Sequence, residues 1–272
     1  MERGSPERVV QDGGPVSWRL ERNLRQVTFA SSRALSVFSE TTSASLSAPH
    51  AHPAWTLLVP VDGGSVTVVA GKTVRVHNDA VLVSPQQQFR AATDGPHVAV
   101  YINAWMAPRA ERGEPRLVPA ALATRMLDAL VVEEGVDLEG ATTEFDRLVG
   151  PIASIDARLA FAIDALPRAY RLDLLAAEIG VSPSRLRALA LDSIGVPLTQ
   201  LRLWSRLARA IALLPYGPAA DAAAAAGFAD QPHFTRTARR FLGRTPADLS
   251  LRSLELRTAD QHQSAHRGSR RD

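Results

Sequence analysis

The chain has 272 residues, 46% of them hydrophobic and 22% charged, a composition typical of a globular protein of about two domains. It contains no cysteine, which excludes disulfide frameworks, thiolate zinc sites, iron–sulfur clusters and thiol nucleophiles. No apolar run reaches the roughly 18 to 20 residues of a membrane-spanning helix, and the N-terminus lacks the apolar segment of a signal peptide. We therefore expect a soluble cytoplasmic protein with no membrane partner.

The net charge of +3 is divided unevenly along the chain. Residues 1–155 hold 14 Arg and Lys against 17 Asp and Glu, a balance of −3, whereas residues 156–272 hold 17 against 11, a balance of +6. An excess of basic residues in one half indicates binding to a polyanion such as nucleic acid.

The first half of the chain has the pattern of a β protein. Residues 1–15 are rich in glycine, proline and charge, and we expect them to be disordered. Short apolar runs then follow at 27–29, 35–38, 55–61, 65–69, 72–76, 80–83 and 98–102. Turn signals separate several of them, at 62–64, 70–72, 77–79 and 94–96. This spacing predicts an antiparallel sandwich or small barrel.

The next segment, residues 111–154, is predicted to be a helical linker. Apolar residues near a spacing of 3.6 form one stripe there: Leu117, Ala121, Leu122, Met126, Leu127 and Leu130. Two interpretations stay open. The stripe packs on its own domain, or it pairs with the same helix of a second copy in a homodimer.

From residue 155 the pattern is helical throughout, with predicted helices at 156–166, 172–179, 183–194, 198–214, 219–226, 231–242 and 246–252. Glycines stand just past four helix ends, at Gly180, Gly195, Gly227 and Gly243. Two helices are predicted to begin with an N-cap before a first-turn proline, at Ser182 and Thr245.

A repeat joins these helices into two units. A short helix, a turn at Gly180 and a longer helix are followed 47 residues later by the same plan around Gly227. Short helix, glycine turn and longer helix is helix-turn-helix geometry, and two such units present two recognition helices to the major groove of a duplex.

At this point residues 156–252 resemble the AraC/XylS transcription regulators. The most specific matches lie at Arg206-Leu207, Ala210, Leu213-Leu214, Gly227-Phe228-Ala229-Asp230, Phe234-Thr235-Arg236 and Gly243-Arg244-Thr245-Pro246. The resemblance implies a DNA-binding half with two helix-turn-helix units joined by a helix.

The chain departs from the family pattern in both recognition helices. Ala190 and Ala238 stand where the family usually has Phe. The first recognition helix has Ala188 and Leu191 where the family often has Arg and Lys, whereas the second keeps Arg236 and an equivalent Arg239. We therefore expect phosphate anchoring to depend mainly on the second unit.

The candidate DNA contacts follow from this geometry. Side chains near the start of each recognition helix are predicted to contact base edges and nearby phosphates, namely Ser184, Arg185, Arg187, Gln231, His233, Thr235 and Arg236. Four further arginines are predicted to contact phosphates, namely Arg209, Arg239, Arg240 and Arg244. Arg267, Arg270 and Arg271 are interpreted as part of a solvated tail.

His50 and His52 stand two residues apart and share one face of a strand. The pattern resembles the cupin barrel that often forms the sensing half of AraC/XylS regulators, in which a Glu and a later His complete the site. Those partners are missing, because Thr56 and Leu57 stand in place of the Glu and Gln88 in place of the third His. Two histidines alone make a poor metal site, so we predict neither a metal nor another cofactor.

The histidines are instead expected to line a pocket for an organic ligand, or to lie at a strand end as surface residues. In the first interpretation the pocket is completed by Trp55, Gln86, Gln88, Phe89, His97 and Tyr101. No Ser/His/Asp set, carboxylate pair or phosphate loop stands out, so we predict that the protein is not an enzyme.

Together these patterns predict a two-domain α+β protein. It has a cupin-like antiparallel β domain at 16–110, a helical segment at 111–154, an all-α DNA-binding domain at 155–253 and a flexible tail at 254–272. The predicted function is sequence-specific regulation of transcription, with double-stranded promoter DNA and a small-molecule effector as partners, and RNA polymerase if it activates. We expect residues 109–151 to couple the two halves.

Two rival functions remain open at this point. One is a metal-dependent cupin enzyme with a helical module. The other is a regulator that acts through protein partners and binds DNA weakly.

Overall fold

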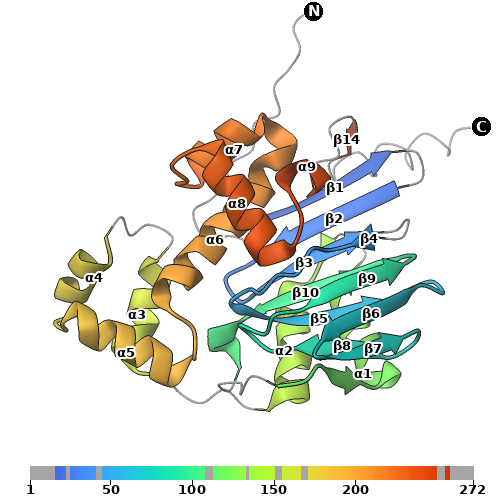
Figure 1. Ribbon diagram of the computed structural model, residues 1–272, viewed down its shortest axis with the longest axis horizontal. Helices are drawn as coiled ribbons and strands as arrows, with labels where there is room; N and C mark the ends of the chain where they lie inside the picture. The colour runs from blue at the N-terminus through green and yellow to red at the C-terminus, as the bar shows by residue number, and fades with distance from the viewer. Residues whose placement is uncertain are drawn as a thin grey trace, which may run out of the picture.

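The computed structural model describes residues 16–22, 25–40, 45–107, 113–132, 135–150, 155–166, 171–249 and 255–257. Strands dominate up to residue 103 and helices dominate after residue 155 (Figure 1). Within these ranges no helix is both long and apolar enough to cross a bilayer. The predictions for residues 1–15 and for the arginines at 267, 270 and 271 lie outside the described residues.

The β half is built on one large antiparallel sheet, with strand order β11-β8-β5-β10-β3-β2-β1-β14. Its strands are β1 (Val16–Arg22), β2 (Arg25–Ser31), β3 (Leu35–Glu40), β5 (Ala54–Pro60), β8 (Ala80–Val83), β10 (His97–Asn103), β11 (Arg116–Val118) and β14 (Glu255–Arg257). Strand β14 pairs with β1 in a part of the chain for which the sequence predicts only a flexible tail.

A second antiparallel sheet covers one face of the first, with strand order β4-β9-β6-β7. It consists of β4 (Ser45–Leu46), β6 (Ser65–Ala70), β7 (Lys72–Val76) and β9 (Arg90–Asp94). A separate short hairpin joins β12 (Val131–Val132) to β13 (Gly135–Val136). The two facing sheets confirm the antiparallel sandwich that the alternating pattern predicts.

Helices α1 (Ala120–Leu130) and α2 (Leu138–Val149) cover the opposite face of the large sheet. Met126 and Leu130 are buried there against Phe145 of α2 and the strand residues. The predicted apolar stripe therefore packs on its own domain. Leu117 lies on β11 and not on the helix, and its side chain is exposed.

The helical half contains every helix that the sequence predicts, and most ends agree within one or two residues. The helices are α3 (Ala157–Ala165), α4 (Leu172–Glu178), α5 (Pro183–Ser193), α6 (Leu198–Leu213), α7 (Ala219–Ala225), α8 (Gln231–Leu242) and α9 (Pro246–Leu249). Short 3-10 turns lie at Ala104–Met106 and Leu214–Tyr216. All four predicted turn glycines have positive φ, of 68°, 79°, 81° and 65° in chain order.

The two helix-turn-helix units pack differently against the rest of the molecule. The first unit, α4 and α5, shares a core with α3 and the start of α6, around Leu159, Leu186 and Leu201. The second unit, α7 and α8, shares one continuous core with the interior of the sandwich, in which Trp204 and Phe241 join Phe38. Figure 1 shows the consequence, with α3 to α5 standing apart from the sheets and α7 to α9 lying beside β1 and β2.

Candidate DNA-binding surface and interdomain cavity

The first recognition helix, α5, presents polar side chains near its start. Ser182 caps the helix by accepting a hydrogen bond from the backbone N–H of Arg185, at 3.1 Å. The predicted contact residues Ser184, Arg185 and Arg187 are all exposed. The helix therefore offers two guanidinium groups on an open surface.

The second recognition helix, α8, carries more positive charge. Asp230 caps it by accepting from the N–H of His233, at 2.5 Å. The exposed predicted residues are Gln231, Arg236, Arg239 and Arg240, while His233 and Thr235 are half-buried. The His233 ring packs edge-on against Phe228, with centroids 5.2 Å apart, so part of this side chain supports the turn before the helix.

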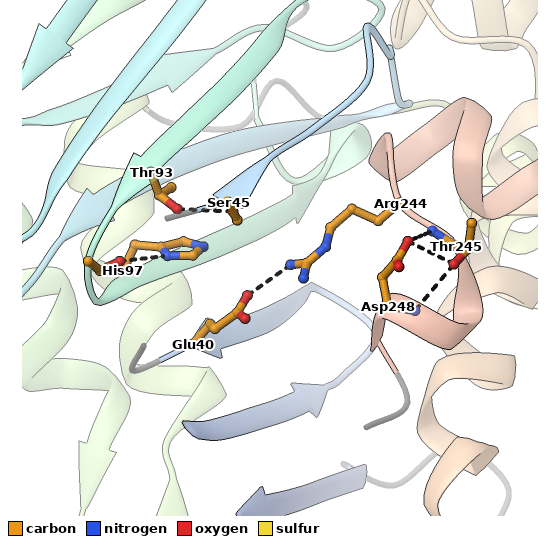
Figure 2. A network of polar contacts seen from close by, with 8 residues as sticks. Glu40, Ser45, Thr93, His97, Arg244, Thr245 and Asp248 are labelled. Carbon is orange, nitrogen blue, oxygen red and sulfur yellow. Dashed lines mark hydrogen bonds and ion pairs between the residues drawn. The ribbon is translucent and has the colours of Figure 1, made fainter. Parts of the chain in front are cut away.

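Arg209 of α6 is also exposed, as predicted for a phosphate contact, but Arg244 is not placed like the other arginines. Its guanidinium donates to Glu40 of β3 at 2.9 Å, and the two side chains are 18% and 1% exposed. It also lies over the ring of Phe38, at 5.5 Å. Figure 2 shows Arg244 reaching from the turn before α9 toward Glu40, with His97 on the neighbouring strand β10.

The predicted contact of Arg244 with a DNA phosphate stays a prediction, and in this structure the side chain is paired with Glu40 of the β domain. A carboxylate at 1% exposure requires a counter-charge, and Arg244 supplies it. In this arrangement Arg244 connects the two domains.

The end of α8 is docked on the segment between β4 and β5. The backbone N–H of Ala48 donates to the carbonyl of Gly243 at 3.1 Å, and that of Ala51 donates to the carbonyl of Arg240 at 3.3 Å. A Cβ at Gly243 would lie 2.5 Å from the carbonyl oxygen of Ala48 and 2.8 Å from Nδ1 of His50. The glycine thus permits both the left-handed turn and the close approach of the β domain.

His52 is buried with both ring nitrogens occupied. Nδ1 donates to the carbonyl of Ala54 at 3.0 Å, and Nε2 accepts from the Thr56 hydroxyl at 2.6 Å. Burial is the main cause that lowers the pKa of His52 to about 3, so the ring is neutral at physiological pH. The ring stacks on Trp204 of α6, with centroids 5.4 Å apart.

His50 lies beside His52 with its Nδ1 bonded to the carbonyl of Ala48, at 2.8 Å. Burial lowers its pKa as well. Among the described residues, no three His, Asp or Glu side chains gather in a way that could hold a metal ion. The two histidines of the cupin-like pattern are thus used in the contact between the domains, where they meet Trp204 and Gly243.

A cavity lies beside this contact, and both domains line it. Its volume, measured as the space open to the centre of a water molecule, is about 70 Å³. One water needs ~10–15 Å³ on the same measure, so the cavity has room for more than one water. Its wall is mainly apolar and aromatic. The β domain contributes Phe29, Phe38, Leu58 and Phe89, and the helical domain contributes Trp204, Leu207, Ile211, Leu242 and Leu249.

Half of the predicted ligand residues line this cavity, and half do not. His50, Phe89, His97 and Tyr101 are in the wall. Trp55 is not, because successive side chains of β5 face opposite sides; it packs toward Phe145 of α2, while Thr56 faces the cavity.

The other predicted ligand residues lie around the cavity. His52 is behind the wall, held by Thr56 and Trp204. Gln88 is exposed. Gln86 donates to Gln200 of α6 at 2.8 Å and so joins the two domains.

Sequence reasoning missed the helical side of the cavity. Trp204, Leu207 and Ile211 follow the helical spacing of an ordinary core stripe, which gives no sign that a β domain covers it. Glu40 carries the one available signal, since it is a carboxylate at the end of an apolar strand. The contact is completed by the indole N–H of Trp204, which donates to Asn103 of β10 at 2.9 Å.

One protein-family model matches part of the helical half of the chain. Residues 175–252 match the model described as a helix-turn-helix domain. No curated protein sequence matches the chain.

Solved structures share the fold over most of the chain. The apo form of a point variant of ToxT from Vibrio cholerae is 13% identical, with a TM-score of 0.53 over 80% of this chain and 97% of that one. Wild-type ToxT bound to an unsaturated fatty acid is 14% identical, with a TM-score of 0.51 over 84% and 95%. The chain therefore has a two-domain fold like that of ToxT, and its residues 175–252 match a helix-turn-helix domain.

Proposed function

We propose that this protein is a sequence-specific DNA-binding regulator of transcription. The observation that carries the proposal is the helix-turn-helix domain at residues 175–252, in which α5 and α8 are two recognition helices with exposed arginines. Helix-turn-helix proteins insert such helices into the major groove, where side chains read base edges. The basic excess of the second half of the chain favours the same partner.

The contacts are divided between the two helices. On α8, Gln231, His233, Thr235 and Arg236 address bases and nearby phosphates, and Arg239 and Arg240 address phosphates, as does Arg209 on α6. On α5 the corresponding residues are Ser184, Arg185 and Arg187. Phosphate contacts set position and base contacts set sequence preference.

A small molecule in the interdomain cavity regulates the binding of DNA. The cavity wall comes from both domains, and its helical part belongs to the same core as α8. ToxT, which shares the fold, has been solved with an unsaturated fatty acid bound. A ligand acts only if it favours one arrangement of the domains over another, because equal affinity for both arrangements shifts nothing.

Further partners belong to the same proposal. The regulator acts in the cytoplasm, contacts RNA polymerase if it activates, and forms a homodimer. The exposed side chain of Leu117 on the edge strand β11 is available for such a dimer contact.

The proposal is tested by measuring binding of the full-length protein to the DNA upstream of its own gene at two salt concentrations. Affinity should fall with a log–log slope of roughly −0.9 for each phosphate contact. Arg236→Ala should weaken the specific complex by about 5- to 150-fold, the equivalent of ~1–3 kcal/mol for a base contact. Arg90→Ala, which removes an exposed arginine of β9, is the matched control and should leave binding unchanged.

A scrambled duplex distinguishes reading of sequence from attraction by charge. Equal affinity for both duplexes, with no effect of Arg236→Ala, would contradict the proposal and favour a regulator that acts through protein partners.

A further inference from the structure

The two recognition helices are built on one plan. Buried residues of α5 correspond to buried residues of α8 at an offset of 48 positions, in the pairs Leu186 and Phe234, Leu189 and Thr237, and Ala190 and Ala238. Because the buried faces correspond, each position on the outer face of one helix has an equivalent on the outer face of the other. The two outer faces can therefore be compared residue by residue.

The outer face of α8, opposite its buried side, carries two arginines. Pro232, Arg236 and Arg239 stand at positions i, i+4 and i+7, a spacing that places them on one side of a helix, and all three are exposed. Arginine is the residue that most often recognises guanine, by donating to O6 and N7 in the major groove. The outer face of α8 therefore suits guanine and the neighbouring phosphates.

The equivalent face of α5 carries no charge. Ser184, Ala188 and Leu191 occupy it at the same spacing. Leu191 is 44% exposed, and Ala188 beside it is half-buried. In Figure 1, α5 lies away from both sheets. An apolar pair thus stands on α5 at the positions where α8 has its two arginines.

The arginines of α5 lie beside this face and not at its centre. At about 100° between successive residues, Arg185 and Arg187 are turned roughly 70–90° away from the middle of the outer face, on opposite sides of it. Side chains at the flanks of a helix in the major groove are placed to reach the phosphates that border the groove, which fix position without reading sequence. The base-facing centre of α5 is left to Ala188 and Leu191.

Apolar side chains recognise one feature of the major groove. Neither Ala188 nor Leu191 can form a hydrogen bond with a base edge through its side chain. The apolar group that base pairs present there is the C5 methyl group of thymine, and side chains such as alanine make apolar contact with it. Burial of one methyl group corresponds to about 4-fold in affinity. An exposed leucine on this face gains further when DNA covers it.

We propose that α5 recognises thymine through its methyl group, and that Ala188 and Leu191 are the residues that contact it. The operator then has two unlike halves, with thymine under α5 and guanine under Arg236 of α8. This inference rests on the proposed binding of DNA and names the bases that the two recognition helices prefer.

The first experiment selects preferred duplexes from a random pool with the full-length protein. We expect an enriched site with thymine in one half and guanine in the other. Selection with Arg236→Ala should relax the guanine half, which assigns that half to α8 and the remaining half to α5. Ala188→Arg gives α5 the residue that α8 has at the equivalent position, and it should replace thymine by guanine in the α5 half.

Deoxyuridine isolates the contribution of the methyl group, because it differs from thymidine by that group alone. Replacing the thymine of the α5 half in the enriched duplex should weaken binding by about 4-fold. Leu191→Ala should lose most of this difference, since the leucine supplies most of the apolar surface of the pair. Leu174→Ala is the matched control. It truncates a leucine of α4 that is 62% exposed, and it should keep the full difference between the two duplexes.

Three results would overturn the inference and leave the proposed binding of DNA in place. They are an enriched site without thymine in the α5 half, equal affinity for the thymine and uracil duplexes, and a difference between them that is unchanged in Leu191→Ala. Failure to enrich any sequence would contradict the proposed recognition of DNA, and this inference with it.

Discussion

At the scale of single residues, an arginine and two histidines whose sequence patterns suggest DNA or metal binding lie at the contact between the two domains. Arg244 is predicted to contact a DNA phosphate, and the structure pairs it with Glu40 in the β domain. His50 and His52 stand in a cupin-like pattern, yet they contact Gly243 and Trp204. Residue type and spacing alone do not reveal this, because the partner of each group comes from the other domain.

The effects of substituting Glu40 and Arg244 on the free energy of unfolding should be coupled, because the two buried charges balance each other. Glu40→Gln leaves the guanidinium of Arg244 without a counter-charge, and we expect the free energy of unfolding to fall by about 3 kcal/mol. Adding Arg244→Met should recover most of that loss, since no buried charge then remains. Urea denaturation of the two variants measures the coupling, and additive losses would show that the side chains act independently.

The control for this experiment is an exposed pair. Lys72 and Glu114 form an ion pair of 2.7 Å with side chains 71% and 60% exposed. Glu114→Gln should change the free energy of unfolding by less than about 1 kcal/mol.

The low pKa of His52 predicts acid sensitivity. In the unfolded chain this ring takes up a proton near pH 6.5, whereas in the folded protein it does so only near pH 3. The unfolded state therefore binds more protons between these values, and stability is lost as pH falls through that window, by about 1.4 kcal/mol per pH unit. Burial lowers the pKa of His50 and His97 in the same direction.

Unfolding free energies at pH 6 and pH 5 measure this contribution. His52→Gln should reduce the difference between them by about 1.4 kcal/mol. His77→Gln, at an exposed position, is the control, and an identical difference in both variants would exclude His52 as the source.

At the scale of elements, much of the fold could be predicted from the sequence. Seven strands and all seven helices from α3 to α9 follow from apolar periodicity, turn glycines and caps, which are local signals. The strands that the sequence does not predict are β1, β4, β9, β11, β12, β13 and β14, because short or polar strands carry little periodic signal. The exposed residues of α5 and α8 agree with the predicted recognition surfaces, while their contacts with DNA stay a prediction.

The cavity could be predicted only in part. His97 and Tyr101 lie on one face of β10, which strand alternation gives, whereas His50 and Phe89 pair in an isolated bridge outside the strands. The cavity residues of α6 and of the turn between α8 and α9 could not be predicted from the sequence. The docking of one domain on the other leaves no periodic pattern in the sequence of either domain. The sequence predicts coupling through residues 109–151, and the described contacts between the halves include β3, β10, Gln86 and residues 47–52.

The close contact between the end of α8 and the β domain should make Gly243 sensitive to substitution. Gly243→Ala places a Cβ 2.5 Å from the carbonyl of Ala48, at a φ of 65°. Gly180→Ala has nearly the same strain, at a φ of 68°, but meets nothing within 4 Å. We expect Gly180→Ala to cost about 1 kcal/mol and Gly243→Ala at least about 1 kcal/mol more. Thermal unfolding compares the stability of the two variants. An equal loss of unfolding free energy in both would contradict the prediction, because the contact between Gly243 and Ala48 would then add nothing to the cost of the Cβ.

At the scale of the whole molecule, the hydrophobic cores do not coincide with the β half and the helical half of the sequence. The second helix-turn-helix unit shares its core with the sandwich, and the first unit has a core of its own. The two units of one DNA-binding domain are thus held to different bodies, joined by the single helix α6. A change in the β domain reaches α8 through their shared core, and it reaches the core of the first unit through α6 and the turn at Ala104.

Amide hydrogen exchange should show this division. The amides of α8 should open together with those of β10, and those of α4 and α5 should open at a lower free energy. Phe241→Leu, in the shared core, should speed exchange in α8 and β10 alike, whereas Leu186→Ala should speed it in α4 and α5 alone. Uniform acceleration by both variants would show one cooperative unit instead.

The position of Trp204 has an optical consequence. Its indole stacks on His52, meets Tyr101 and Phe241 edge-on, and donates its N–H to Asn103, so both domains surround one fluorophore. When the domains part, water replaces the neighbours on the β side of the ring, and its emission shifts to longer wavelength. The protein thus carries its own fluorescent label at the contact between its two domains.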